Sequence, residues 1–116
     1  MLRFFGYASL LISVAIIGYF AVQSYKKESP AQETASQTGA IAAAKALYQQ
    51  KSSEGIDFSD GPCLSDEVIS GWAVDIAHNP RESIDEISQN QCASVRDGKV
   101  KHFVELDTSG NLIRAE

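Results

Sequence analysis

The sequence predicts an α+β protein in which one N-terminal transmembrane helix precedes a single small domain. Three observations lead to this prediction: a long uncharged run near the N-terminus, a stretch of helix-forming residues from Ala40, and period-two hydrophobic patterns after Glu54. We expect a helix packed on a small antiparallel sheet of about three strands, closed by one disulfide. The length of 116 residues leaves room for one such domain.

The uncharged run extends from Phe4 to Tyr25 and contains 22 residues. A helix of this length rises about 33 Å, which matches the bilayer hydrocarbon core of about 30 Å. Arg3 precedes the run and two lysines follow it, as is typical of a membrane-spanning helix. We therefore expect residues 1–27 to form a single-pass anchor.

A cleaved signal peptide is the alternative to an anchor. Its apolar region is usually only about 7 to 15 residues long, and Val22-Gln23-Ser24 is a weak match to its cleavage motif. The positive charges flanking the run are balanced, so they do not decide its orientation. The short N-terminal tail and the two cysteines favour an N-terminus inside and a C-terminal domain outside the cytoplasmic membrane.

A polar segment and a helix are expected next. Residues 28–39 contain no large apolar side chain and include Pro30, which predicts a polar linker before a domain of residues 40–116. Strong helix formers from Ala40 predict a helix with Thr38 as N-cap and Gly55 as its end. Its large apolar side chains are few: Ile41, Leu47 and Tyr48. The helix either leans on the domain along one side or forms a partly frayed stalk.

A first strand is predicted by alternation between two sets of side chains. One set is expected to face the core and the other the solvent: Trp72, Val74 and Ile76 against Ala73, Asp75 and Ala77. Asn79-Pro80 should end this strand, because proline cannot donate to a ladder. Short helical turns are expected at Ser65 to Ile69 and at Ser83 to Ser88.

A hairpin is predicted near the C-terminus. In VKHFVEL one face should carry Val100, His102, Val104 and Leu106, and the other Lys101, Phe103 and Glu105. A further strand begins at Leu112, and the intervening DTSGN contains Gly110 and Asn111, which favour positive φ. Asp97-Gly98 should form the turn that leads into this hairpin.

Cys63 and Cys92 are the only cysteines, and a bond between them would enclose 30 residues. The spacing is not the C-x-x-C of redox-active pairs, and two thiols supply too few ligands for a metal. We predict a structural disulfide, with two free buried thiols as the alternative. A crosslink of this span stabilises by about 3.6 kcal/mol, against a total of about 5 for a small domain.

Other candidate sites are weaker. Asp75, His78 and His102 are metal-ligand types, but Asp75 and His78 should point to opposite faces of a strand. The acidic segment from Asp57 to Gly61 lacks the glycine position and the final glutamate of a calcium loop, so an ordinary turn is expected. Nucleophilic catalysis by Cys92 with a histidine as base would need a free thiol at Cys92, and a disulfide would remove that thiol. With no nucleotide-binding or G-x-S-x-G motif, we expect no enzyme, no cofactor and no metal.

Charge limits the class of partner. From Glu28 onward the chain holds seven Lys or Arg and fifteen Asp or Glu, for a net charge of −8. Such an acidic segment disfavours nucleic acid and electrostatic docking to anionic lipid. The expected partners are the bilayer, through the N-terminal helix, and a protein of the membrane or envelope. We thus expect a non-enzymatic binding or assembly module, with an enzyme using an unrecognised site as one alternative.

A second alternative follows from the layout of an apolar N-terminal helix, a further helix and a sheet with a C-terminal disulfide. This layout resembles that of type IV pilins and pseudopilins, which implies processing after Gly6 and assembly into a filament. The chain departs from those proteins in having Leu11 where their mature chain has glutamate, and Pro30 where their helix continues.

Overall fold

The computed structural model describes residues 29–116, so the predicted anchor lies outside the described part of the chain. Among residues 29–116 no helix is both long and apolar enough to cross a bilayer. The elements are, in order, α2 (Pro30–Ser53), β1 (Cys63–Ile69), β2 (Trp72–Ile76), the 3-10 helices η1 (Ser83–Glu86) and η2 (Ser88–Asn90), α3 (Ala93–Arg96), β3 (His102–Leu106) and β4 (Leu112–Ala115). They form an α+β fold with a helix packed on a four-stranded sheet.

Helix α2 begins at Pro30, ten residues before the predicted start at Ala40. Proline is favoured at the first helical position, where its missing N–H costs nothing, so Pro30 starts the helix instead of marking a linker. Thr38 is not the N-cap, because it lies inside the helix and its hydroxyl donates to the carbonyl of Thr34 at 3.0 Å. The helix ends at Ser53, and Gly55 follows with φ +80°, as expected.

The sheet is mixed and has the order β1-β2-β3-β4. The predicted hairpin is confirmed, since β3 and β4 pair antiparallel, but β2 and β3 pair parallel in unbroken register. The prediction of a purely antiparallel sheet is therefore wrong. The helical turn expected at Ser65 to Ile69 is also wrong, because these residues belong to strand β1, which pairs with β2 through two register shifts.

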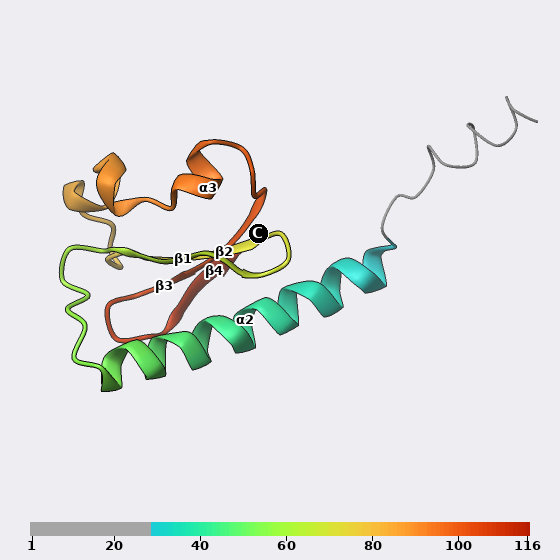
Figure 1. Cartoon of the computed structure of the whole chain (residues 1–116), viewed down its shortest axis with the longest axis horizontal. Helices are drawn as coiled ribbons and strands as arrows, with labels where there is room; N and C mark the ends of the chain where they lie inside the picture. The colour runs from blue at the N-terminus through green and yellow to red at the C-terminus, as the bar shows by residue number, and fades with distance from the viewer. Residues whose placement is uncertain (1–28) are drawn as a thin grey trace, which may run out of the picture. The chain divides into compact units, whose positions relative to one another are not determined.

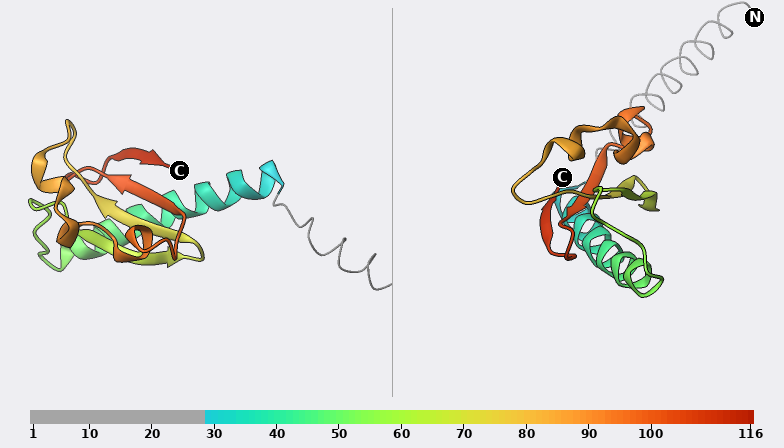
Figure 2. Two further views of the ribbon diagram at one scale, coloured as in Figure 1. Left: turned by 90° about the horizontal axis from the view of Figure 1, so that it is seen from above. Right: turned by 90° about the vertical axis from the view of Figure 1, so that its left-hand side faces the viewer.

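Both faces of the sheet are covered, as Figures 1 and 2 show: α2 lies along one face, and the connection holding η1, η2 and α3 lies over the other. Strand β2 is consequently buried on both sides and not on one as predicted. Trp72, Val74 and Ile76 join the core beneath α2, while Ala73 joins a second cluster with Cys92 and Val100. Val100 lies before β3 and packs on the opposite face from the one predicted.

Small residues let α2 approach the sheet closely. Ala40 and Ala44 are fully buried in the interface, and the indole N–H of Trp72 donates to the hydroxyl of Ser36 at 2.9 Å. Near the other end of the helix, the Tyr48 hydroxyl donates to the carbonyl of Thr108 at 2.9 Å. The helix is thus fastened to the sheet along one side, and the alternative of a frayed stalk does not apply to this part.

Candidate functional site

A row of four neighbouring residues crosses the sheet on the face away from α2. The strand register places Cys63 beside Asp75, Asp75 beside Glu105, and Glu105 beside Arg114. A disulfide sulfur, two carboxyls and a guanidinium are therefore contributed by four different strands. This row is the centre of the candidate site.

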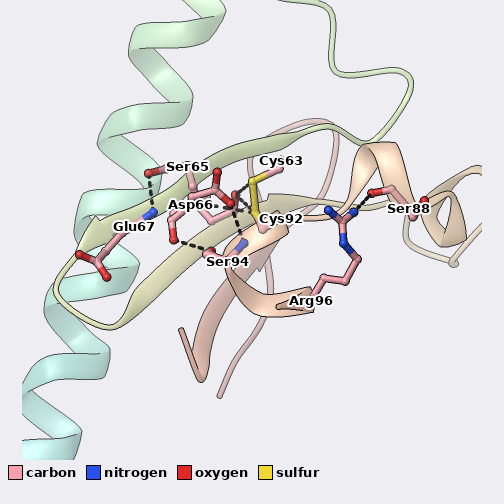
Figure 3. The surroundings of a disulfide bond; sticks show 9 residues. Cys63, Ser65, Asp66, Glu67, Ser88, Cys92, Ser94 and Arg96 are labelled. Atoms are coloured by element: carbon pink, nitrogen blue, oxygen red, sulfur yellow. Dashed lines mark hydrogen bonds between the residues drawn. A yellow bond between two sulfur atoms is a disulfide. The ribbon is translucent and has the colours of Figure 1, made fainter. Parts of the chain in front are cut away.

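The Cys63–Cys92 disulfide bounds the site at the β1 edge, and its prediction is confirmed, with the two Cα atoms 4.9 Å apart. Figure 3 shows how it joins β1 to the segment that enters α3. Beside it, the carboxylate of Asp66 accepts the N–H of Ser94 at 3.0 Å, and the Ser94 hydroxyl donates to the carbonyl of Asp66 at 2.6 Å. Covalent and hydrogen bonds together hold α3 on β1.

Glu105 is the most heavily engaged carboxylate of the site. Its residue is only 4% exposed, and its two oxygens accept from different arginines: Arg81 at 2.8 Å and Arg114 at 2.9 Å. The Arg114 guanidinium also lies 4.9 Å from the centre of the Phe103 ring. Because each carboxylate oxygen of Glu105 accepts a hydrogen bond from a guanidinium, this side chain is a fixed part of the framework.

Asp75 differs, because its carboxyl oxygen Oδ1 is buried and has no hydrogen-bond partner among residues 29–116. Burial raises the pKa of Asp75 to about 7, and the negative charge of Glu105 adds to the rise. Asp75 therefore exchanges a proton near neutral pH while Glu105 beside it is held by two arginines.

Two cavities flank the disulfide. The larger, of about 650 Å³, lies between β1 and η2, and its charged side chains are already bonded: Asp66 to Ser94, and Arg96 to the carbonyl of Ser88 at 2.7 Å. The smaller, of about 200 Å³, is lined by the two carboxyls, three arginines, one amide and three apolar side chains: Asp75, Glu105, Arg81, Arg96, Arg114, Gln91, Cys92, Val95 and Phe103. We take the smaller cavity as the candidate binding position, because Asp75 and Glu105 of the row both line it.

A second buried carboxylate fastens the connection after β2. Asp85 is 3% exposed and accepts the backbone N–H groups of His78 and Glu82 at 3.0 and 2.9 Å, with the His78 ring 2.9 Å away. Burial alone would raise the pKa of Asp85, but these hydrogen bonds outweigh it and hold the pKa below its usual value. The hydrogen bond with Asp85 in turn raises the pKa of His78. This cluster positions the segment that carries Arg81.

The other residues considered as ligands are not brought together. His102 stacks on Trp72 with ring centres 4.8 Å apart, on the opposite sheet face from Asp75, and His78 is held by Asp85. Asp57 accepts the N–H of Ser59 at 2.9 Å in an exposed turn. Cys63, Cys92 and Asp66 lie close enough to share an ion, but the thiols are consumed by the disulfide.

Sequence reasoning missed the row because it assigned Asp75 to a solvent-facing side of β2. A signal was present: Asp75 and Glu105 are single acidic residues inside the apolar segments AVDIA and FVEL. An ionisable group in a buried strand is costly unless paired, so its presence there marks either a structural network or a site.

Comparisons with protein-family models, curated proteins and solved structures gave no match to this chain.

Proposed function

We propose that this protein is a single-pass membrane protein that displays a small disulfide-bonded domain outside the cytoplasmic membrane, where the domain binds a partner protein without catalysis. The binding position is the cavity of about 200 Å³ that contains Asp75. One observation carries the proposal: Asp75, whose buried oxygen Oδ1 has no hydrogen-bond partner among residues 29–116, lines a cavity in which Glu105 is held by Arg81 and Arg114.

Two features support the location of the domain outside the cytoplasmic membrane. The run from Phe4 to Tyr25 suits a membrane anchor, and a disulfide persists in oxidising compartments and is rare in the cytosol. The same features support an N-terminus inside and a domain outside, which begins with α2 at Pro30 and not at residue 40 as the sequence predicted.

The roles of the charged groups in the cavity favour binding over catalysis. A carboxyl with a pKa near 7 suits general acid–base chemistry, which favours the alternative of an enzyme. However, its neighbour Glu105 is held by two arginines, and among residues 29–116 no serine, threonine, tyrosine, lysine, histidine or free cysteine lines the same cavity. A lone titrating carboxyl among fixed charges is better suited to holding a ligand than to turning one over.

The binding proposal is tested by site-specific photocrosslinking in intact cells. A photoreactive amino acid replaces Gln91, which lines the cavity, or Gln49, which is exposed on α2 as the matched control. We expect one discrete protein adduct from position 91 only, lost when Val95→Phe fills the cavity. Equal adducts from both positions, or an adduct unaffected by Val95→Phe, would contradict binding at this cavity.

Fractionation and intact mass test the anchor and separate it from the pilin-like alternative. We expect the protein to remain in membranes after high-salt washing and its mass to include the N-terminal segment. A mass lacking the first six residues would support pilin-like processing after Gly6 instead. Recovery in the soluble fraction with an intact N-terminus would refute the anchor.

A further inference from the structure

We propose that the cavity of about 200 Å³ binds the C-terminal carboxylate of the partner protein through three arginines, with the apolar side chain of the partner's last residue packed on Val95 and Phe103. This inference rests on the proposed function of the domain as a protein-binding module, and it names the chemistry by which the partner is recognised.

The three arginines reach the cavity from different segments and keep donors for a ligand. Arg81 lies in the connection after β2, Arg96 ends α3, and Arg114 lies on β4. Their side chains are 41%, 44% and 47% exposed. They donate to protein groups through Nε and Nη1, whereas no Nη2 of the three donates to any group of residues 29–116. A carboxylate can therefore bind these donors without displacing Glu105 from its two arginines.

The charges that line the cavity favour an anion. The lining holds three guanidiniums and two carboxyls, and Glu105 is already paired with two of the guanidiniums. The second carboxyl belongs to Asp75, whose oxygen Oδ1 is buried and meets no ligand. The other carboxylates that pair with these arginines do not line the cavity, and solvent screens their exposed charges: Glu86, Asp97 and Glu116. An anion thus meets a surplus of positive charge, and a cation would be repelled.

The apolar wall and the small volume select the last residue of a chain. Val95 and Phe103 pack against the cluster of Ala73, Cys92 and Val100 but are only partly buried, so each keeps accessible apolar surface. A volume of about 200 Å³ lies below the roughly 300 to 1,000 Å³ of drug-sized sites, so one residue must supply both the carboxylate and the apolar group. A C-terminal residue does so, because its carboxylate and its side chain share one Cα.

Asp75 gives the binding a pH dependence. The charged groups around it come from β3, the connection after β2, α3 and β4: Glu105, Arg81, Asp85, Arg96 and Arg114. A bound anion favours the protonated form of Asp75, whose pKa is about 7. A terminal carboxylate, with a pKa of about 3.5, stays ionised throughout, so affinity should be up to about tenfold higher at pH 6 than at pH 8.

The experiment uses the full chain in maltoside micelles with ¹³C-methyl-labelled valine, titrated with N-acetyl-L-leucine. We expect a saturable shift of the Val95 methyl signals, with affinity up to about tenfold higher at pH 6 than at pH 8. N-Acetyl-L-leucinamide, which has nearly the same shape without the charge, should give no saturable shift. Equal binding of the amide, no saturable binding of the acid, or tighter binding of the acid at pH 8 would overturn the proposal.

Two further probes separate the sources of the anion. N-Acetyl-L-glutamic acid α-amide carries its carboxylate only on the side chain, and inorganic phosphate has no apolar part. Both should bind about tenfold more weakly than N-acetyl-L-leucine, because each loses contact with the apolar wall. Equally tight binding of the glutamate derivative would assign the site to an acidic side chain, and equally tight binding of phosphate would reveal a bare oxyanion site. Either result would overturn the assignment to a chain end.

Matched variants identify the donors. Arg96 is the arginine to replace, because it is not bonded to Glu105 and its loss leaves that framework intact. Arg96→Gln should weaken binding of N-acetyl-L-leucine at least about tenfold. Lys99→Gln removes an exposed cation outside the cavity and should bind as the parent does. Unchanged binding in Arg96→Gln, or an equal loss in Lys99→Gln, would overturn recognition by the arginines.

A third variant gives a readout that a loss of folding would not produce. Asp75→Asn removes the charge that opposes the anion, so it should bind N-acetyl-L-leucine at pH 8 about as tightly as the parent does at pH 6. Weaker binding than the parent at pH 8 would contradict the proposal. If the Gln91 crosslink persists while carboxylate binding fails, the ligand chemistry is wrong and the binding function stands.

Discussion

Glu105 holds three parts of the domain together with one side chain. It lies on β3, and its two oxygens bind Arg81 from the connection after β2 and Arg114 from β4. The carboxylate is 5% exposed while the two arginines are 41% and 47% exposed, so solvent screens the pairs from one side only. In glutamine one of these two acceptor oxygens is replaced by an NH2 donor that faces an arginine donor, and the charge attraction is lost.

We expect Glu105→Gln to lower the free energy of unfolding by about 1 to 3 kcal/mol. The figure stays below that of a fully buried pair, because both arginines can recover water contacts. Urea denaturation measures it. The control is Glu86→Gln, an exposed glutamate that also pairs with Arg81, which should change stability by no more than about 0.5 kcal/mol. Equal losses from the two variants would mean that Glu105 is not a framework residue.

Asp75 should make the domain less stable as the pH rises. Its folded pKa of about 7 lies above the ordinary value of 3.8, so the folded state retains the proton more strongly than the unfolded state does. The resulting stabilisation is present below pH 3.8 and is lost as the pH rises through about 7.

Asp75→Asn should therefore gain stability relative to the parent between pH 5 and pH 8, measured as the difference in melting temperature at each pH. The raised pKa of His78 acts in the same direction, since its stabilisation is lost as the pH rises above the ordinary value of 6.5. Because His78 is present in both proteins, the difference between them isolates Asp75. A difference that does not change with pH would show that Asp75 has an ordinary pKa.

At the scale of elements, two glycines mark places where the chain packs too closely for a side chain. A Cβ on Gly110, in the turn between β3 and β4, would lie 2.5 Å from the Tyr48 ring of α2. A Cβ on Gly61, before β1, would lie 2.6 Å from Asp85 Oδ1. Helix, hairpin and connection are thus joined through turns that only glycine fits.

Gly110→Ala should destabilise the domain more than Gly98→Ala does. Both glycines have positive φ, +86° and +72°, so both variants should lose about 1 to 2 kcal/mol from backbone strain. Only Gly110→Ala must also displace Tyr48, which weakens its hydrogen bond to Thr108, whereas Gly98 has open space around it. Chemical denaturation measures the free energy of unfolding of both variants. Equal losses would show that Tyr48 can be displaced without destabilising the domain.

At the scale of the whole molecule, the disulfide and the α2 interface stabilise opposite faces of the same sheet. The core beneath α2 includes Trp72, Val74, Ile76, Val104 and Leu106, while the other face buries a smaller cluster around Ala73 and Cys92. The face with less apolar packing is the one that carries the crosslink, so the crosslink adds to the Ser94–Asp66 hydrogen bonds and the small cluster in holding α3 in place.

Replacing both cysteines by serine should lower the free energy of unfolding by about 3.6 kcal/mol, because the closed loop has 30 residues. Thermal unfolding of the full chain in micelles measures the effect. Ser65→Ala is the control, since Ser65 caps no helix and its hydroxyl accepts only the Glu67 N–H in β1. A melting temperature equal to that of the parent would mean that the sheet and α2 suffice without the bond.

Local chemistry in the sequence determined the body of α2, the β2 strand, the β3–β4 hairpin and the disulfide, because each has a signal within a few residues or a unique pairing. Strand β1 lacked such a signal: Asp66 and Glu67 are adjacent, which breaks the period-two pattern, and its pairing depends on two register shifts. Only the tertiary structure decided that β2 pairs parallel with β3, because that pairing joins segments separated by a long connection.

The candidate site follows from this non-local pairing. Parallel register brings Asp75 beside Glu105, and antiparallel register brings Glu105 beside Arg114. A sequence shows that Asp75 is acidic and lies in an apolar strand, but its pKa depends on burial by the connection that crosses the second face of the sheet and on the charge of Glu105. Both the burial and the neighbouring charge depend on which segments lie side by side in the fold, and no local sequence pattern encodes that arrangement.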